Sequence, residues 1–477
     1  MVNYKNKISQ AITNAYGLRD EDKETVYSLY QLYDKKLRRN MLRDCYYEMK
    51  NKPKDLGISV PPHLKDLCQV IGWSAKAVDS LANRSQFDGF VCNDEQKLAE
   101  IQSFCSRNGF KRKYRKAVRC ELKHSCSFLT ATKSENGLAV VNVYPATAAS
   151  ALWSDHLGRI VAGMVVVDRD NSARAGGMPT WINVFTDENI IELHFDSGVW
   201  FAEYYPHGMG RCHMEVLANN ATLERPMGTS RITRAVMDIT DSAMRASVRA
   251  EISSEFFTSP QKYLLGADKS ALGDQSKWDA YIGNIFAVAR DKTGDVPQFG
   301  QLSQGTMQPH IDYMRSLAAR FSGETNIPIS ELGVVQDNPA SAEAIYASKE
   351  ALVIDAQNLN SDNGEALVTV AKMAMAIEAN KSFDEVEAEG LVLQPKFKNP
   401  ALPSIVSQAD AIVKAVSAFP WLASSDVALE EFGFNDEQIQ RLQQVRKMAE
   451  ARELTSARLS ALNKAGGNDY TEQNNAI

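Results

Sequence analysis

The sequence predicts an α+β fold, in which a helical first part leads into an antiparallel sheet and then into long helices. Residues 20–130 place Tyr and Leu at helical spacing, and residues 126–217 contain short segments rich in Val, Ile and aromatic residues. Residues 231–257 continue as one long helical pattern. Helices and strands that are segregated along a chain in this way are typical of α+β proteins.

The composition is that of a soluble globular protein, and the length suggests roughly two to four domains. The chain has 477 residues, of which 44% are hydrophobic and 23% are charged. It contains no run of about 18 apolar residues, so we expect no contact with a membrane. The seven cysteines lie in the first half without a disulfide pattern, and the first residues lack an apolar signal core. We therefore expect a protein of the reducing cytoplasm.

The sequence of residues 1–130 indicates three helices and a basic cluster. The helices cover Thr25–Asn51, Pro62–Leu81 and Asp94–Asn108. A basic cluster follows, which consists of Lys111, Arg112, Lys113, Arg115, Lys116 and Arg119. Residues 1–130 carry 24 Lys and Arg against 15 Asp and Glu, whereas the remainder carries 29 against 44. The cluster fits either a contact with nucleic acid or the solvated face of a helix, and the pattern leaves both open.

The next part predicts strands that are bounded by turn residues. They are Cys126–Thr132, Gly137–Ala146, Arg159–Asp168, Thr180–Asp187, Asn189–Phe195 and Gly198–Pro206. Branched and aromatic side chains of this kind pack well on a half-buried, pleated surface. We expect these segments to form an antiparallel sheet.

A long helix then begins after a turn, and its apolar side is narrow. Thr229 or Ser230 can cap its start by accepting backbone N–H bonds. The apolar residues recur at alternating steps of four and three: Ile232, Val236, Ile239, Ala243, Ala246 and Ala250. A seam of this width is typical of coiled coils. The pattern leaves open whether the seam packs against copies of the chain or inside one chain.

Residues 259–304 are an insert punctuated by Gly and Asp, with a strand candidate at Tyr281–Ala289. A second seam helix follows, in which Pro309 is tolerated in the first turn. Its apolar stripe consists of Met307, Ile311, Met314, Leu317 and Phe321. Two seam helices that bracket a compact insert predict a two-legged stalk with a small head.

A further long helix is predicted after a short polar loop. Asn338 is a suitable N-cap, and Pro339 is a suitable first helical residue. The chain then breaks at Phe397–Pro403 and again at Phe419–Trp421. A charged helix is predicted from Asn435 to Lys464, and the polar tail after it is expected to be disordered.

No motif of a known catalytic class occurs in the sequence. It lacks the phosphate-binding P-loop, the HExxH zinc motif, the G-x-S-x-G elbow and the GxGxxG fingerprint. Cys120, His124 and Cys126 do not have a standard zinc spacing. We therefore expect no enzyme activity, catalytic residue, metal or cofactor. A metal-dependent nucleic-acid enzyme that uses the surplus of Asp and Glu is the less favoured alternative.

Five strings in the sequence resemble the portal proteins of tailed bacteriophages, in the subgroup typical of phages with long non-contractile tails. In chain order they span Val141–Val167, Asn219–Thr233, Glu255–Asp268, Ile327–Val353 and Leu429–Met448. The second string carries an Asn-x-x-x-x-Arg-Pro-x-Gly-x-Ser pattern. The resemblance covers roughly residues 30–450, and its specificity comes from several strings in the same order.

The resemblance implies a portal-like fold with a mixed wing domain, a two-helix stem, a small α/β clip insertion, a long tunnel helix and a helical crown. The wing covers 1–228, the first stem helix 229–258, the clip 259–304 and the second stem helix 305–328. The tunnel loop, the long helix and a return to the wing cover 329–395, the crown covers 396–464 and the disordered tail covers 465–477.

The resemblance further implies a structural homo-oligomer, a ring of about 12 copies at one capsid vertex. A terminase motor packages DNA through the ring, and the DNA is later ejected. The implied partners are double-stranded DNA without sequence preference, the terminase large subunit, head–tail connector proteins, and the major capsid and scaffold proteins. The implied location is the virion, after assembly in the host cytoplasm. Another phage head–tail structural subunit is the alternative.

The resemblance also implies roles for particular residues. The DNA-facing tunnel loop corresponds to Val334, Val335, Gln336, Asp337 and Asn338. The seam from Ile232 to Ala250 corresponds to a contact between subunits. Arg245, Arg249 and Arg315 are candidates for charges that face the channel or a neighbouring subunit, and a solvated face is the open alternative.

Overall fold

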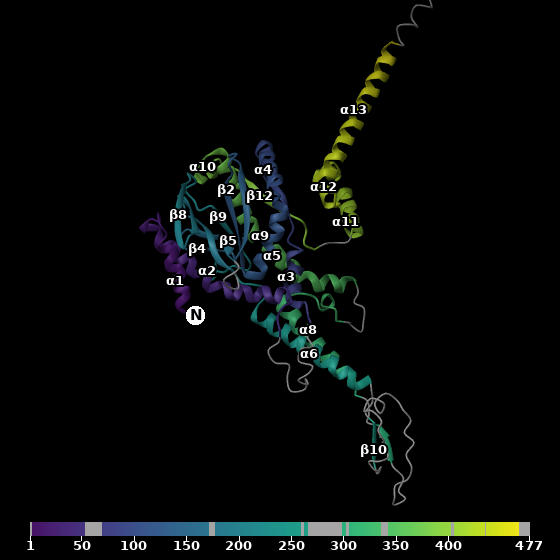
Figure 1. Ribbon diagram of the computed structural model, residues 1–477. Helices are drawn as coiled ribbons and strands as arrows, with labels where there is room; N and C mark the ends of the chain where they lie inside the picture. Colours follow the sequence, from purple (N-terminus) through teal and green to yellow (C-terminus); the bar gives the residue numbers. More distant parts are fainter. Residues whose placement is uncertain are drawn as a thin grey trace, which may run out of the picture. The chain divides into compact units, whose positions relative to one another are not determined.

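The computed structural model describes residues 2–52, 69–170, 177–258, 262–265, 298–301, 305–334, 342–401, 405–434 and 436–466. The chain divides into two compact units, Met1–Pro400 and Ala401–Ile477. Figure 1 follows both units from purple at the N-terminus to yellow at the C-terminal helix.

Five described helices belong to the first part of unit 1. They are α1 (Val2–Thr13), α2 (Asp20–Tyr47), α3 (Trp73–Ala82), α4 (Glu95–Asn108) and α5 (Phe110–His124). The expected start of α4 is confirmed, because the Asp94 side chain accepts the backbone N–H groups of Gln96 (2.9 Å) and Lys97 (3.2 Å). Gly109 joins α4 to α5 at φ +57, in the left-handed region that favours glycine.

The helix expected at Pro62–Leu81 corresponds to α3, which begins only at Trp73. Residues 53–68 lie outside the described residues, and residues 69–72 are not helical. Within α3, Ala77, Val78 and Leu81 are buried in the main core of unit 1. The periodic apolar residues of this segment were therefore a sound signal for a helix, but not for its first residue.

Two antiparallel sheets contain the strands that were expected between residues 126 and 206. The larger has the order β4-β5-β6-β7-β8, formed by Ala149–Ser154, Arg159–Asp170, Met178–Phe185, Asn189–Asp196 and Val199–Pro206. The other has the order β3-β2-β9, formed by Ala139–Pro145, Cys126–Lys133 and Met214–Ala218. The chain thus divides the expected strands between two sheets.

A third, two-stranded sheet joins distant parts of unit 1. β1 (Phe87–Cys92) lies antiparallel to β12 (Leu393–Phe397), with Phe90 opposite Pro395. β1 was not predicted, because it is only six residues long and its partner follows about 300 residues later. This pairing places β12 in unit 1, whereas the resemblance starts the crown at residue 396.

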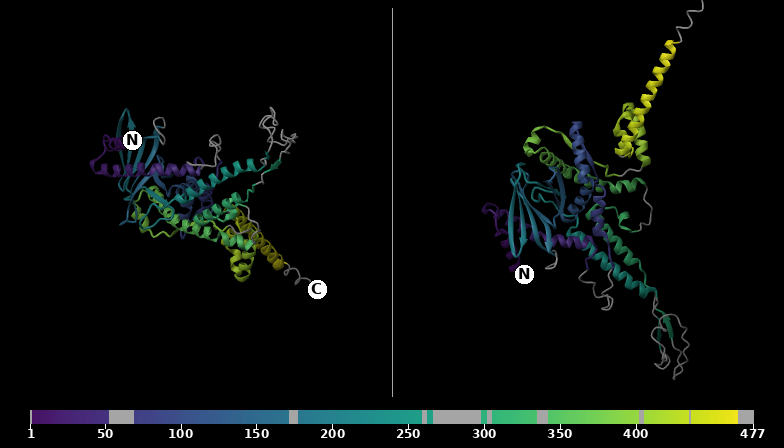
Figure 2. Two further views of the ribbon diagram at one scale, coloured as in Figure 1. Left: turned by 90° about the horizontal axis from the view of Figure 1, so that it is seen from below. Right: turned by 45° about the horizontal axis from the view of Figure 1, so that its top comes forward.

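Helices α1 and α2 pack on the five-stranded sheet, as Figures 1 and 2 show. Val26, Leu29 and Tyr33 of α2 share a buried core with Met164 of β5 and Ile182 of β6. Fully burying a large apolar side chain contributes about 1.5–3 kcal/mol. The amphipathic face of α2 therefore fixes this helix on the sheet.

Helices α6 (Arg234–Thr258) and α8 (Gln308–Thr325) pack against each other. The insert between them begins and ends with a short strand, β10 (Lys262–Leu265) and β11 (Gln298–Gln301). These two strands pair with each other in an antiparallel ladder. Figure 1 shows the two helices side by side, leading to β10. The strand candidate Tyr281–Ala289 lies outside the described residues.

The start of α6 differs from the expectation. The side-chain oxygen of Thr233 accepts the backbone N–H of Val236 (3.1 Å), so Thr233 caps the helix in place of Thr229 or Ser230. Ser230 instead donates its hydroxyl to the backbone oxygen of Lys123 (2.6 Å) at the end of α5. The segment before α6 is therefore fixed to α5 rather than wound into the helix.

Helix α9 (Ala342–Ala379) is a single helix of 38 residues that follows the short helix η3 (Ile329–Leu332). It packs along β2, β9 and β12, and its residues Leu352, Leu367 and Val370 are buried in the main core. α10 (Phe383–Ala388) follows it. The expected N-cap, Asn338, and Pro339 lie outside the described residues.

Unit 2 is helical over most of its described residues. It contains α11 (Ile405–Ala418), η4 (Pro420–Ser424), α12 (Asp426–Glu431) and α13 (Asp436–Gly466). The charged helix expected at 435–464 is confirmed as α13, and the expected break at Phe419–Trp421 falls where η4 begins. Among the helices described in both units, none combines the length and the apolar character that a membrane crossing requires.

Candidate functional site

The predicted seam of the first stalk helix lies mostly inside the chain. Five of its six residues are at most 3% exposed and belong to the main core of unit 1: Ile232, Val236, Ile239, Ala243 and Ala246. Side chains that are covered within one chain cannot form a contact with another. The structure therefore corrects the expectation for these five residues and favours the internal packing that the pattern had left open. Ala250, the last of the six, is half-buried.

The burial of the apolar stripe on the second stalk helix also decreases along the helix towards the insert. Leu317 and Phe321 are buried in the main core, whereas Ile311, which lies nearer the insert, is 45% exposed. The two helices thus share a core where they join the rest of unit 1. Further out, this core ends and apolar side chains become accessible.

The three arginines predicted as channel or intersubunit charges are half-buried on α6 and α8: Arg245, Arg249 and Arg315. The guanidinium of Arg245 donates a hydrogen bond to the Ser242 hydroxyl, one turn earlier in α6 (2.9 Å). A half-buried arginine packs its stem on the helix and keeps its charged head near solvent. This position is compatible with each of the roles considered for these residues.

Of the predicted loop residues, Val334 is described, and Val335, Gln336, Asp337 and Asn338 lie outside the described residues. Val334 is half-buried and packs against the main core. The neighbouring Gly333 ends η3 with φ +75, so it turns the chain out of this short helix in a conformation that favours glycine. The first residue of the predicted loop is therefore part of its base.

A cluster of charges holds both sides of this loop. Glu331, which precedes the loop in η3, has three cations within 4.0 Å: Arg84 (3.6 Å), Lys76 (3.9 Å) and Lys349 (4.0 Å). Lys349 lies in α9, so its ion pair with Glu331 joins the segments before and after the loop. Arg84 is only 8% exposed and also donates to the backbone oxygen of Pro400 (3.0 Å). Networks of this kind contribute more than isolated surface pairs.

Arg231, in the segment before α6, connects α3, α8 and α9. Its Nε donates to the backbone oxygen of Ala77 at α3 (3.0 Å), and its Nη1 donates to Oδ2 of Asp355 in α9 (3.0 Å). Its Nη2 donates to the backbone oxygen of Thr325 at the end of α8. Burial lowers the pKa of this guanidinium, and Asp355 opposes that change. Because guanidinium presents five donors in a rigid plane, one side chain can fix three elements.

A buried polar network holds α9 against α5. The amide nitrogen of Asn363 in α9 donates to Glu121 Oε2 (2.9 Å) and to the Tyr114 hydroxyl (3.2 Å), both in α5. The Tyr114 hydroxyl also lies 2.6 Å from the hydroxyl of Ser85, which donates to the side-chain oxygen of Asn360 in α9 (2.6 Å). All five side chains are buried. A buried network of this kind specifies one position of α9 along α5.

Within this network, burial raises the pKa of Glu121 to about 8, although the hydrogen bond from Asn363 acts in the opposite sense. Glu121 Oε1 and Asn363 Oδ1 are both buried without a hydrogen-bond partner. A single proton on Glu121 Oε1 can satisfy both atoms, since it can be donated to the Asn363 oxygen. We therefore expect Glu121 to be neutral in the folded chain at pH 7.

The basic cluster predicted at 111–119 lies mainly on the exposed face of α5. Lys111 forms an ion pair with Asp88 (2.8 Å). Three other members line a cavity of about 310 Å³ and make no ion pair within the described part of the chain: Arg112, Arg115 and Lys116. This arrangement fits both the solvated face and the contact with an anionic partner that the sequence had left open.

The thiol and imidazole groups considered as metal ligands have other surroundings. Burial raises the pKa of the Cys126 thiol to about 12, because an apolar environment favours the uncharged form. His124 Nε2 lies 2.9 Å from an oxygen of Asp44. Among the residues that the structure describes, no group of three or more His, Cys, Asp and Glu side chains could hold a metal ion.

None of the residues that connect these elements was predicted from the sequence: Arg231, Glu331, Glu121 and Asn363. For Glu121 a signal existed, because it follows Tyr114 by seven residues and so lies on the same, buried face of α5. A carboxyl group on an apolar helix face requires a buried partner. Arg231 carried no comparable signal, because its partners come from three elements that are distant in the sequence.

The sequence of the chain is similar to those of portal proteins from phages. The family model described as phage portal protein, SPP1 Gp6-like, matches residues 28–453. The portal protein of Mycobacterium phage L5 is 25% identical over 387 residues, which are 77% of this chain and 77% of the phage L5 protein. That of Mycobacterium phage D29 is 24% identical over 429 residues, which are 87% of this chain and 85% of the phage D29 protein.

A similarity to solved structures is weaker. A chain of the structure titled "Virion of native gene transfer agent (GTA) particle" matches with a TM-score of 0.40 and 12% sequence identity. The match covers 73% of this chain and 86% of that chain.

Proposed function

This chain belongs to the family of phage portal proteins described as SPP1 Gp6-like, and we propose that its copies form the portal ring at one vertex of a phage capsid. The match to the family model carries this proposal, because it runs through residues 28–453 and includes elements of both units. The protein is then a structural component of the virion. Double-stranded DNA is packaged through the ring and later leaves by the same channel.

The domain divisions implied by the resemblance are part of this proposal. The helices α6 and α8 are the two stem helices, and residues 259–304 are the clip. The packing of α6 on α8 and the β10–β11 ladder support this assignment, because they give the insert a paired entry and exit. The sheets with α1 to α5 are assigned to the wing, α9 to the tunnel helix and the helices of unit 2 to the crown.

The loop at Val334–Asn338 is proposed to approach the DNA. Its base is held by the charges around Glu331, and α9 behind it is held by Arg231 and Asn363. A loop beside moving DNA requires such a fixed base, because any displacement of the base would move the loop as well. The net charge of −6 also suits a channel, since extensive neutralisation of phosphates would hold the DNA tightly.

Contacts between neighbouring stems are proposed for the outer parts of α6 and α8. Ala250 is half-buried and Ile311 is 45% exposed, so apolar surface is accessible there. Arg245, Arg249 and Arg315 are proposed to face either the channel or the neighbouring subunit. Both positions fit half-buried arginines on these helices.

The partners of this ring follow from its place in the virion. The clip is proposed to face the terminase large subunit during packaging and the head–tail connector proteins afterwards. The remaining surface meets the major capsid and scaffold proteins during assembly in the host cytoplasm. ATP hydrolysis belongs to the terminase in this scheme, so the chain itself is assigned no catalytic residue and no cofactor.

Negative-stain electron microscopy, combined with native mass spectrometry, tests the proposed function. We expect rings of about 12 subunits with an axial hole. Because some rings require a scaffold to assemble, the purified chain is measured alone and with the scaffold protein, over a range of concentrations. A chain that stays monomeric or dimeric under all of these conditions contradicts the proposal and favours another head–tail structural subunit.

A further inference from the structure

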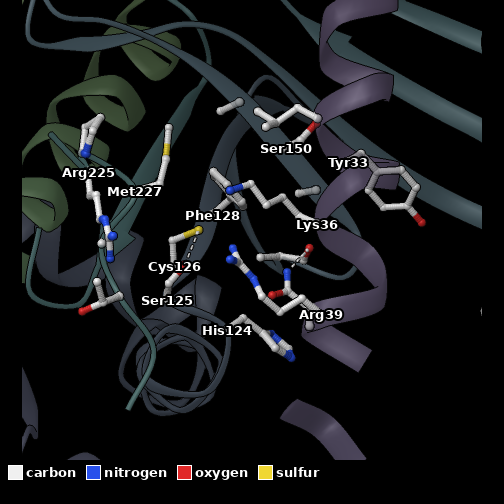
Figure 3. A pocket seen from close by; sticks show the side chains of 18 of the residues that line it. Tyr33, Lys36, Arg39, His124, Ser125, Cys126, Phe128, Ser150, Arg225 and Met227 are labelled. Carbon is white, nitrogen blue, oxygen red and sulfur yellow. Dashed lines mark hydrogen bonds between the residues drawn. The ribbon is translucent and has the colours of Figure 1, made fainter. Parts of the chain in front are cut away.

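A basic cavity lies between α2 and the loop that leads to α6. Its volume is about 470 Å³. Lys36, Arg39 and Arg43 line it from α2, and Arg225 lines it from the loop. Figure 3 shows Lys36 and Arg39 reaching from α2 into the space that faces Arg225 and Met227. Four cations from two elements therefore converge on one recess.

Glu224 also lines the cavity, next to Arg225 in the loop, but the four cations make no ion pair with it or with any other acidic residue that the structure describes. The Nη1 of Arg43 donates only to neutral groups, the side-chain oxygen of Asn40 (3.2 Å) and the backbone oxygen of His124 (2.8 Å). Its Nε is buried and has no hydrogen-bond partner. The cavity thus contains donors that nothing within the described chain uses.

The positive charges of these side chains also repel one another. Burial, followed by repulsion from Arg39, lowers the pKa of Arg43 to about 10. Burial and the charges of Arg39 and Lys35 likewise lower the pKa of Lys36. Like charges on one helix face destabilise the helix, and a half-buried cation without an acidic partner is poorly solvated. An anion bound between these side chains would relieve both effects.

The shape and lining of the cavity indicate what this anion belongs to. Part of the wall is apolar and consists of Phe128, Ala146, Ala149, Ala151 and Met227. A peptide segment can enter such a recess with a carboxylate and adjoining apolar groups. A DNA duplex carries its phosphates along the outside of a rod, so it contacts an open basic stripe rather than a recess.

We propose that this cavity receives an acidic segment of the neighbouring copy of this chain, an inference that rests on the proposed portal ring. In a cyclic ring each contact is heterologous, so a cavity on one subunit meets a different surface of the next. The chain carries both kinds of charge, because residues 1–130 have a surplus of basic residues and the remainder has a surplus of acidic residues. Hydrogen bonds between a carboxylate and guanidinium groups are roughly twice as strong as neutral ones.

Charge reversal in the cavity tests the inference. The variant combines Lys36→Glu with Arg39→Glu, and its control combines Lys35→Glu with Arg38→Glu. The control residues are exposed on the same helix, outside the cavity lining, and the change in net charge is the same. We expect the cavity variant to need about tenfold more protein for half-maximal ring assembly than the control, as measured by native mass spectrometry.

The melting temperature of the unassembled subunit separates docking from a role in folding. Since the cavity cations repel one another, the variant subunit should melt at the same temperature as the wild type or at a higher one. A ring defect that is accompanied by a lower melting temperature of the subunit would assign these residues to folding and overturn the proposal.

Zero-length coupling with a carbodiimide identifies the occupant. Rings are assembled from equal amounts of ¹⁵N-labelled and unlabelled chains, and the Lys36 amine is coupled to any carboxylate that contacts it. We expect Lys36 peptides joined to acidic peptides of the other isotope, which proves a contact between subunits. Coupling only within one isotope, or none, overturns the inference.

The outcomes also separate this inference from the proposed function. If the wild type forms no ring, the proposed function fails and the inference fails with it. If the wild type forms rings and both double variants assemble equally well, the ring stands and only the inference is overturned. If the cavity variant instead loses affinity of the ring for duplex DNA without a change in assembly, the occupant is nucleic acid and the inference is likewise overturned.

Discussion

The buried pair of Glu121 and Asn363 leads to a prediction about the position of one proton. If Glu121 is protonated, its acid group and the amide of Asn363 each donate one hydrogen bond to the other. Glu121→Gln reproduces this pair without a titratable group, because an amide N–H replaces the acid O–H. We therefore expect the variant to fold and to keep α9 in place against α5.

The direction and size of the effect follow from the pKa. Burial raises the pKa of Glu121 from 4.5 to about 8, so the folded chain keeps a proton that the unfolded chain releases. The stability linked to this proton is complete below about pH 4.5 and is lost as the pH rises towards about 8. At about 1.4 kcal/mol per pH unit, the wild type loses roughly 5 kcal/mol across this range, whereas Glu121→Gln loses none of it.

The assay compares the melting temperatures of Glu121→Gln and the wild type between about pH 5 and about pH 8.5. We expect a small difference at the lower pH and a difference of several degrees, in favour of the variant, at the higher pH. Glu135→Gln changes an exposed turn and is the matched control, which should show no such trend. A difference between Glu121→Gln and the wild type that does not vary with pH would refute the reasoning.

Three further substitutions test other parts of the structure by chemical unfolding of the subunit. Arg231→Ala should lower the free energy of unfolding by about 3–5 kcal/mol, because it leaves Asp355 without its cation, whereas the exposed Arg234→Ala should change it by less than about 0.5 kcal/mol. Gly228→Ala should lower the free energy of unfolding clearly more than Gly158→Ala. Both glycines have φ near +60, but a Cβ at Gly228 would lie 2.3 Å from a backbone oxygen, whereas a Cβ at Gly158 would meet nothing within 4 Å. Ala246→Glu should destabilise the subunit itself by several kcal/mol, since the site is only 3% exposed; equal stability of the variant and the wild type would contradict its place in the core.

Local signals in the sequence were enough to predict many elements of this fold. Asp94 was the expected start of a helix, and its carboxylate caps α4. Most strand segments between residues 126 and 206 were recognised from their composition and turns, although β4 at Ala149–Ser154 was not predicted. Both features depend on residues that are close together in the sequence, and so does the charged helix α13.

Features that depend on distant partners could not be predicted in this way. The strand β1 exists because β12 pairs with it, and nothing in its six residues names that partner. The role of Arg231 is likewise set by acceptors at Ala77, Thr325 and Asp355. Thr229 and Ser230 were chemically suitable caps, but α6 starts later because Ser230 is bound to the end of α5. In each case tertiary contacts select among several locally acceptable arrangements.

The seam of α6 shows how far a periodic pattern can be interpreted. Apolar residues at alternating steps of four and three predict that one face of a helix is buried along its length. They do not indicate whether the same chain or another chain buries it. Near the rest of unit 1, enough elements surround α6 to cover Ala243 and Ala246 from within. Nearer the insert, Ala250 is only half-buried and Ile311 of α8 is 45% exposed. The same apolar periodicity therefore serves the subunit core at one end of α6 and α8 and leaves accessible apolar surface at the other.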